Sequence, residues 1–132
     1  MASGSAIPRK KIIYVDDVNA SLIVLKKALK AHYEIFLADS ISKMYKIMEK
    51  IKPDLILLDV LMPDTGGFEI IKKLKDDKRY SDIPVIFITV NSDKESVEEG
   101  LSLGAVAYAV KPFNTLKLVE TINNQLYKKD RA

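Results

Sequence analysis

The sequence predicts an α/β protein built on one parallel sheet of five strands, with helices on both faces. Short runs rich in Ile, Leu, Val and Phe alternate with longer segments in which apolar residues recur every three or four positions. This alternation is strict from the first apolar run to the last periodic segment, and the connections are short. Strict alternation of this kind is typical of a parallel sheet covered by helices on both sides.

Size and composition indicate a single globular domain. A chain of 132 residues is long enough for one core and too short to indicate two. No apolar run approaches the length of about 18 residues that a membrane-spanning helix needs, so we expect no membrane segment. We expect 1–10 to be a flexible leader, 11–129 the folded domain and 130–132 a tail.

Charge and cysteine content narrow the classes of function. The chain has no cysteine, which excludes disulfides, thiol catalysis and cysteine metal sites, and it suits a cytoplasmic location. The net charge is +3, from 21 basic and 18 acidic residues. The lysines are spread along the helical segments, whereas a face that binds nucleic acid usually shows clustering. We therefore expect no direct nucleic-acid binding.

Five short apolar runs are the expected strands. In chain order they are 11–15, 34–38, 54–59, 83–89 and 105–110. The run 55–58 (LILL) is apolar throughout, which is typical of a strand buried on both faces. Asp59 follows it directly, and Pro63 with Gly66 and Gly67 then favours a turn into the next helix.

Helices are expected between these strands. The first is expected over 18–32, and the second starts at Asp39 or Ser40 and is stopped by Pro53. The third runs from Phe68 to the charged run 75–79, the fourth from 92 to 103, and the last follows Asn114. Asp17 or Asn19 can cap the first of them, Ser92 with Glu95 forms a capping box for the fourth, and Asn114 can cap the last. Gly104 stands where a helix C-terminus is expected. The residues expected to face the core from the last helix are Leu116, Val119, Ile122 and Leu126.

Polar residues follow four of the five expected strands. Asp16 and Asp17 end the first strand, Asp59 the third, Thr89 the fourth and Lys111 the fifth. Right-handed crossovers place the carboxyl ends of all strands at one edge of the sheet. If the strand order is 2-1-3-4-5, the first and third strands are neighbours at the point where ligands bind in open α/β sheets. The three carboxylates then share one cleft.

This set of side chains suits phosphoryl transfer to a carboxylate. Three carboxylates at close range raise one another's pKa, and a divalent cation with oxygen ligands offsets the repulsion. We expect Mg²⁺, with Mn²⁺ as a substitute, held by Asp17 and Asp59, with Asp16 contributing directly or through water. Asp59 is the expected nucleophile, and Lys111 and the Thr89 hydroxyl are expected to contact the phosphoryl oxygens.

Each of these residues also has an ordinary structural interpretation. Asp17 alone is a plausible helix cap, Thr89 a plausible strand former and Lys111 a plausible solvated lysine. His32, the one histidine, is expected to be solvated near the end of the first helix. The combination at one edge favours the functional interpretation.

At this point the sequence resembles the receiver domain of two-component response regulators. The matching elements are the acidic pair Asp16–Asp17, the block DVLMPDTGGFE that holds Asp59, then Thr89, and the block GAVAYAVKPF that holds Tyr108 and Lys111. The match runs from about Lys11 onward, with the order of elements found in that family. The resemblance implies a flavodoxin-like doubly wound (βα)5 fold with strand order 2-1-3-4-5.

The resemblance also implies a function. The phosphoryl donor is expected to be the phosphohistidine of a sensor histidine kinase or phosphotransfer protein, and Asp59 the acceptor. The backbone carbonyl of Leu61 is expected to be a further Mg²⁺ ligand, and the peptide before Pro112 is expected to be cis. Thr89 and Tyr108 match the switch pair of the family.

In that family the switch changes partner binding. Phosphorylation is expected to shift the face made by the fourth helix, fifth strand and fifth helix toward binding a downstream output protein or domain, as a shift of population between two states. Phosphorylation-dependent homodimerisation is left open. The chain is expected to be a signalling switch that catalyses only its own phosphorylation and dephosphorylation, not a turnover enzyme.

Three other classes of protein fit less well. A hydrolase with an aspartate nucleophile typically has a second acid two residues later, where this chain has Leu61. A pure interaction module usually lacks one of the five polar residues, all of which are present here. Flavin binding on a similar fold needs a phosphate loop after the first strand, where Asp16 and Asp17 repel phosphate.

Overall fold

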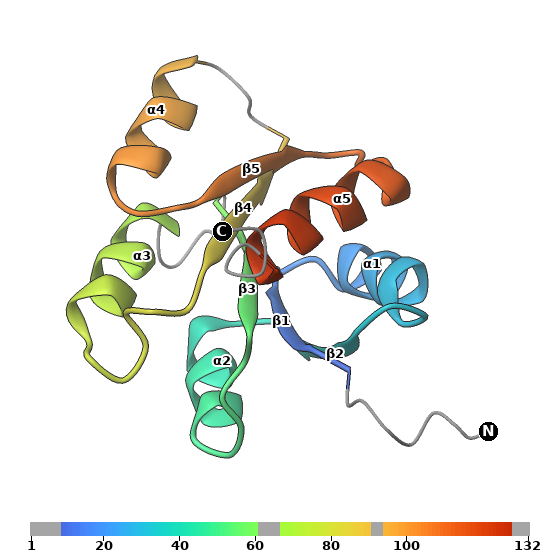
Figure 1. The fold of residues 1–132 in the computed structure, drawn as a ribbon, viewed down its shortest axis with the longest axis horizontal. Coiled ribbons are helices and arrows are strands. Elements are labelled where there is room, and N and C mark those ends of the chain that lie inside the picture. Colours follow the sequence, from blue (N-terminus) through green and yellow to red (C-terminus); the bar gives the residue numbers. More distant parts are fainter. Residues whose placement is uncertain (1–8, 61–66, 91–93, 128–132) are drawn as a thin grey trace.

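Strands and helices alternate along the whole described part of the chain (Figure 1). The computed structural model describes residues 9–60, 67–90 and 94–127. The strands are β1 (Lys11–Val15), β2 (Glu34–Ala38), β3 (Leu55–Asp59), β4 (Val85–Thr89) and β5 (Ala107–Val110). The helices are α1 (Asn19–Leu29), α2 (Ile41–Met48), α3 (Gly67–Asp76), α4 (Lys94–Ser102) and α5 (Thr115–Leu126).

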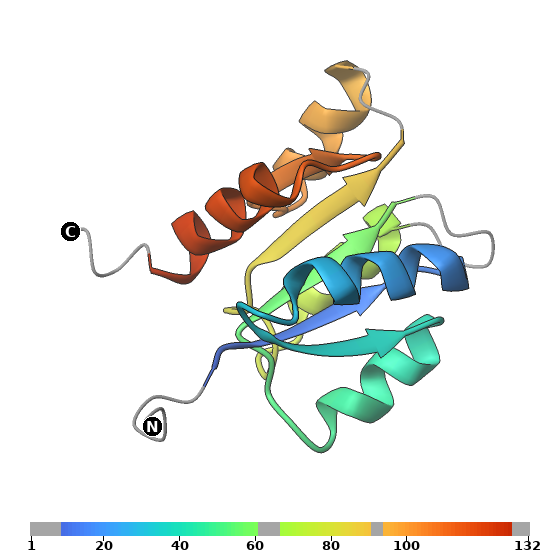
Figure 2. The ribbon, with the colours of Figure 1, turned by 90° about the vertical axis from the view of Figure 1, so that its right-hand side faces the viewer.

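All five strands are parallel, in the order β2-β1-β3-β4-β5. The predicted fold class and strand order are therefore confirmed. The strands run in the same direction across the sheet, so their carboxyl ends form one edge (Figure 2). In the described residues no helix is both long and apolar enough to cross a membrane.

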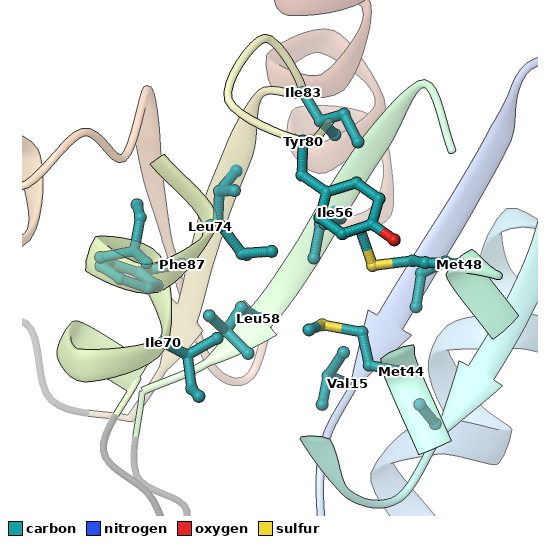
Figure 3. Packing of buried hydrophobic residues seen from close by; sticks show 14 of the residues in the cluster. Val15, Met44, Met48, Ile56, Leu58, Ile70, Leu74, Tyr80, Ile83 and Phe87 are labelled. Atoms are coloured by element: carbon teal, nitrogen blue, oxygen red, sulfur yellow. The ribbon is translucent and has the colours of Figure 1, made fainter. Parts of the chain in front are cut away.

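Two hydrophobic cores lie on opposite faces of the sheet, because successive strand residues point to opposite sides. On one face Ile13, Ile56 and Phe87 pack under α2 and α3 (Figure 3). On the other face Ile12, which is adjacent to Ile13, and Leu57, which is adjacent to Ile56, pack under α1 and α5. β1, β3 and β4 are thus covered on both sides, which explains why their sequences are almost continuously apolar.

The first helix differs from its prediction at both ends. It ends at Leu29, short of His32, which is exposed as expected. Its N-cap is Val18, which makes no side-chain cap, so neither Asp17 nor Asn19 takes that role. Just before the helix, the Val18 backbone N–H donates a hydrogen bond to the Asp16 carboxylate at 2.9 Å.

Asn114 is confirmed as a helix cap, and Ser40, one of the two residues expected to start the second helix, is the N-cap of α2. Ser40 accepts a hydrogen bond from the Lys43 backbone N–H at the start of α2, and Asn114 accepts one from Lys117 at the start of α5. Ser92, the expected partner of Glu95, lies outside the described residues.

Proline does not end the second helix as predicted. α2 stops at Met48, well before Pro53, because the backbone N–H groups of both Lys50 and Ile51 donate to the carbonyl of Ile47 and tighten the last turn. Further on, Gly104 has φ +120°, a conformation open to glycine, and follows the end of α4 as expected.

The inner face of α5 is only partly as predicted. Leu116 is 79% exposed, so its expected place in the core is wrong. Ile122 is buried as predicted, and Val119 and Leu126 are partly buried against the same core. Leu118, four residues before Ile122 on the same side of the helix, is buried in place of Leu116. Leu116 lies two residues from Leu118, which on a helix is nearly the opposite side.

Candidate functional site

Strand register places Asp16 and Asp59 side by side. Val15 pairs with Leu58 across β1 and β3, so the next residues along the two strands are Asp16 and Asp59. The strands that lead to these carboxylates are buried throughout, except for the half-buried Lys11 at the start of β1. Asp16 has no solvent exposure and Asp59 is 5% exposed.

The same register brings Thr89 and Lys111 to this edge. Asp59 pairs with Ile88, so Thr89 stands one step beyond it on β4. Thr89 pairs with Val110, and Lys111 follows directly at the end of β5. The Lys111 backbone N–H donates to the Thr89 carbonyl at 2.8 Å, which continues the ladder by one bond.

Lys111 joins two of the carboxylates. Its Nζ donates to Asp16 Oδ2 at 2.6 Å and to Asp59 Oδ2 at 3.2 Å. Burial opposes the charge on this ammonium, but the two carboxylates outweigh it and raise the pKa of Lys111 above its usual value. The peptide between Lys111 and Pro112 is cis, as the resemblance implied.

Asp16 is held by three donors. Its Oδ2 accepts from Lys111 Nζ and from the hydroxyl of Tyr14 at 2.5 Å, and its Oδ1 accepts from the Val18 backbone N–H. Burial acts to raise the pKa of Asp16, but the hydrogen bonds from Lys111, Tyr14 and Val18 outweigh it and lower that pKa. The carboxylate is therefore ionised at neutral pH.

Three carboxylates converge at this edge. Ligand oxygens of Asp16, Asp17 and Asp59 all lie within 4.8 Å of one another, and only Asp17 is exposed to solvent. A set of hard oxygen donors, two of them buried, matches the preference of Mg²⁺. The residues present thus fit a divalent cation. Leu61, the expected carbonyl ligand, lies outside the described residues.

Thr89 and Tyr108, the expected switch pair, lie on neighbouring strands. Thr89 is 1% exposed at the end of β4. Tyr108 pairs with Phe87, two residues before Thr89, and the two rings meet edge to face with centroids 5.5 Å apart. The Tyr108 hydroxyl donates to the Ser96 carbonyl at 3.1 Å, which links β5 to α4.

Gly100 makes room for this aromatic contact. A Cβ at Gly100 would lie 2.8 Å from the rings of both Phe87 and Tyr108. Such a distance is shorter than van der Waals contact, so the glycine lets α4 approach β4 and β5 closely.

Tyr14 is the site residue that sequence analysis missed. It lies in the middle of an aliphatic strand, where a tyrosine is readily taken for another core residue. The signal was its position two residues before Asp16, because residues i and i+2 of a strand share one face. Burial and the hydrogen bond to Asp16 together raise the pKa of Tyr14.

Known proteins share this fold and this sequence pattern. The chemotaxis protein CheY4 of Vibrio cholerae superimposes with a TM-score of 0.82 at 30% identity, over 88% of this chain and 98% of that one. The doubly wound fold is thus that of CheY-like proteins. The family model of the response regulator receiver domain matches residues 12–123, and the chain belongs to that family.

Curated relatives agree with this assignment. The polar-differentiation response regulator DivK of Brucella ovis is 31% identical, over 89% of this chain and 96% of DivK. The phosphate regulon transcriptional regulatory protein PhoB of Pseudomonas aeruginosa is 37% identical, over 83% of this chain and 48% of PhoB. A histidine kinase, P4 of Formosa agariphila, contains a segment 35% identical to 89% of this chain.

The relatives also show how such domains are used. The chain spans less than half the length of several curated relatives it matches, PhoB among them. Receiver domains of two-component systems are phosphorylation-controlled signalling switches that work with histidine kinases and output domains, and they are not classical enzymes.

Proposed function

We propose that Asp59 accepts a phosphoryl group from the phosphohistidine of a sensor histidine kinase or phosphotransfer protein, in the cytoplasm. The observation that carries this proposal is the placement of Lys111, whose Nζ contacts both Asp16 and Asp59 at the buried edge of the sheet. A fixed ammonium beside a carboxylate supplies the positioning and charge neutralisation that phosphoryl transfer needs.

Transfer forms one bond and breaks one. An Asp59 carboxylate oxygen attacks the phosphorus, the P–N bond of the donor breaks, and its electron pair leaves with the imidazole. Lys111 Nζ then contacts a phosphoryl oxygen in place of Asp59 Oδ2, and the Thr89 hydroxyl donates to another. Asp17, Asp59 and the Leu61 carbonyl would hold Mg²⁺, with Asp16 contributing directly or through water and with Mn²⁺ as a substitute. Bound Mg²⁺ neutralises the charge that develops on the phosphoryl oxygens.

The response passes from Asp59 on β3 to β4, the neighbouring strand, and then to β5. Thr89 moves toward the phosphoryl group and Tyr108 turns further inward, giving up its bond to the Ser96 carbonyl. The change favours one state of the face made by α4, β5 and α5, which binds a downstream output protein or domain. Direct nucleic-acid binding is not part of this function, and homodimerisation on phosphorylation is a further outcome to test. The functional unit is 11–129.

Intact mass spectrometry tests the proposal. We expect the native chain, incubated with MgCl2 and phosphoramidate or acetyl phosphate, to gain one phosphoryl group, and EDTA to prevent the gain. Phosphoramidate carries the P–N bond of the natural donor. Asp59→Ala is expected to abolish the adduct. Asp82→Ala, which removes an exposed carboxylate at the opposite edge of the sheet, is the matched control and is expected to keep it.

Other outcomes identify the rival classes of protein. No adduct from either donor or from a phosphorylated histidine kinase, with the fold intact, contradicts the proposal and favours an interaction module that works without phosphorylation. Steady turnover of phosphate esters favours a hydrolase.

A further inference from the structure

Tyr14 is an unusual member of a buried strand. Its ring is fully buried among the aliphatic residues that pack under α1 and α5. Its hydroxyl reaches the charged edge of the sheet and donates to Asp16 Oδ2 at 2.5 Å. The same oxygen accepts from Lys111 Nζ at 2.6 Å, so a neutral donor and a cation share one carboxylate oxygen.

The neighbouring carboxylates of Asp16 and Asp17 therefore differ in how many hydrogen-bond donors they already bind. An ionised carboxylate offers about four acceptor positions, and on Asp16 three are taken by Tyr14, Lys111 and the Val18 backbone N–H. Asp17 is exposed to solvent. A divalent cation that approaches Asp16 has to compete with these donors, whereas Asp17 is open to solvent.

We propose that Tyr14 is a positioning residue that keeps Asp16 bound to Lys111 and thereby weakens the binding of divalent cations at this site. The inference rests on the proposed function, because it concerns the cation that assists phosphoryl transfer to Asp59. The physical basis is that hydrogen-bond donation occupies a lone pair and draws negative charge away from the carboxylate. Both effects reduce what Asp16 offers to a cation.

Tyr14 also stabilises the site when no cation is bound. Asp16, Asp17 and Asp59 repel one another at this range. The Tyr14 hydroxyl and the Lys111 ammonium reduce that repulsion, because both donate hydrogen bonds to Asp16 Oδ2. We therefore expect the site to remain assembled without a cation.

Calorimetric titration of the metal-free chain with MgCl2 tests the inference. We expect Tyr14→Phe, which removes one hydroxyl and keeps the ring, to lower the Kd for Mg²⁺ by about three- to tenfold, less than the whole contribution of a hydrogen bond to a charged group. The matched control is Tyr33→Phe. Tyr33 is also buried and its hydroxyl donates to Asn123 Oδ1 at 2.7 Å, on α5. Its loss is expected to change the Kd by less than about twofold, because it is not part of the carboxylate cluster.

A double-mutant cycle shows whether Tyr14 acts through Asp16. In the Asp16→Asn background, Tyr14→Phe is expected to leave the Kd for Mg²⁺ unchanged, because the negative charge on which the hydroxyl acts is gone. Circular dichroism checks the fold of every variant.

The outcomes separate this inference from the proposed function. A Kd for Tyr14→Phe that is unchanged or higher, with normal Mg²⁺ binding by the native chain, overturns the inference alone. Tightening that persists in the Asp16→Asn background overturns it as well, because Tyr14 then acts elsewhere. No MgCl2 binding by the native chain overturns both the inference and the proposed function.

Discussion

At the carboxyl edge of the sheet, Lys111 joins Asp16 and Asp59 at 2.6 and 3.2 Å, and at the amino edge Lys52 joins Asp82 at 3.2 Å. The distances are similar but the surroundings are not. The side chains of the Lys52 pair are 61% and 70% exposed, whereas those of Lys111, Asp16 and Asp59 are 18%, 0% and 7% exposed.

The comparison separates ion pairs that are expected to contribute to the stability of the fold from those that are not. Solvent screens an exposed pair and the pair contributes little to stability. Charges removed from water depend on their partners, because losing one partner leaves the other buried and uncompensated. Among the described residues, the ion pairs with largely buried side chains are those of Lys111 at the carboxyl edge, so a change of charge there, such as phosphorylation, is expected to act strongly on the fold.

The largest effect is expected from Lys111→Met. Without added cation, this variant is expected to lose about 3–5 kcal/mol of unfolding free energy, because Asp16 and Asp59 remain buried without the ammonium that joins them. Urea unfolding in EDTA measures the loss, and MgCl2 is expected to restore part of it. A native-like midpoint in EDTA would contradict the view that this pair differs from the exposed ones.

An intermediate effect is expected in acid. The pKa of Asp16 is lowered from its ordinary value of 3.8, so the unfolded chain binds its proton before the folded chain does. The stability from Asp16 is thus complete above about pH 4 and is lost as the pH falls further. Asp16→Asn removes this titration and is expected to make the loss shallower, by up to about 1.4 kcal/mol per pH unit.

Asp77 provides the matched control for the loss of stability at low pH, here called the acid limb. Its pKa is also lowered, by hydrogen bonds from Arg79, but the pair is exposed near the amino edge. Asp77→Asn is therefore expected to change the acid limb less than Asp16→Asn does, and 1 M salt is expected to remove the difference between Asp77→Asn and the native chain. Equal effects of the two substitutions would mean that burial does not distinguish the edges.

The smallest effect is expected from Lys52→Met. The loss of this exposed pair is expected to change the unfolding free energy by less than about 0.5 kcal/mol. Urea unfolding in the same buffer allows direct comparison with Lys111→Met. A loss above about 1 kcal/mol would show that the amino edge contributes more than its exposure indicates.

Much of the fold could be predicted from local sequence patterns. The apolar run Leu55 to Leu58 indicated a strand covered on both faces, and the caps at Ser40 and Asn114 were identified correctly. Local patterns failed where two helix faces were nearly equally apolar, as with Leu116 and Leu118, because the sheet alone decides which face is buried. The caps expected for α1 were wrong, because its N-cap is Val18, whose side chain cannot accept a hydrogen bond.

The sequence by itself determined which polar residues stand at strand ends, since alternating runs and turn residues are local features. Asp16, Asp59, Thr89 and Lys111 could all be named from that pattern. Only the tertiary structure decided how they meet. Lys111 contacts Asp16 across 95 positions of the chain, and that contact depends on strand order and register. The donation from Tyr14 to Asp16 depends on side-chain direction at the sheet edge, which hydrophobic periodicity does not encode.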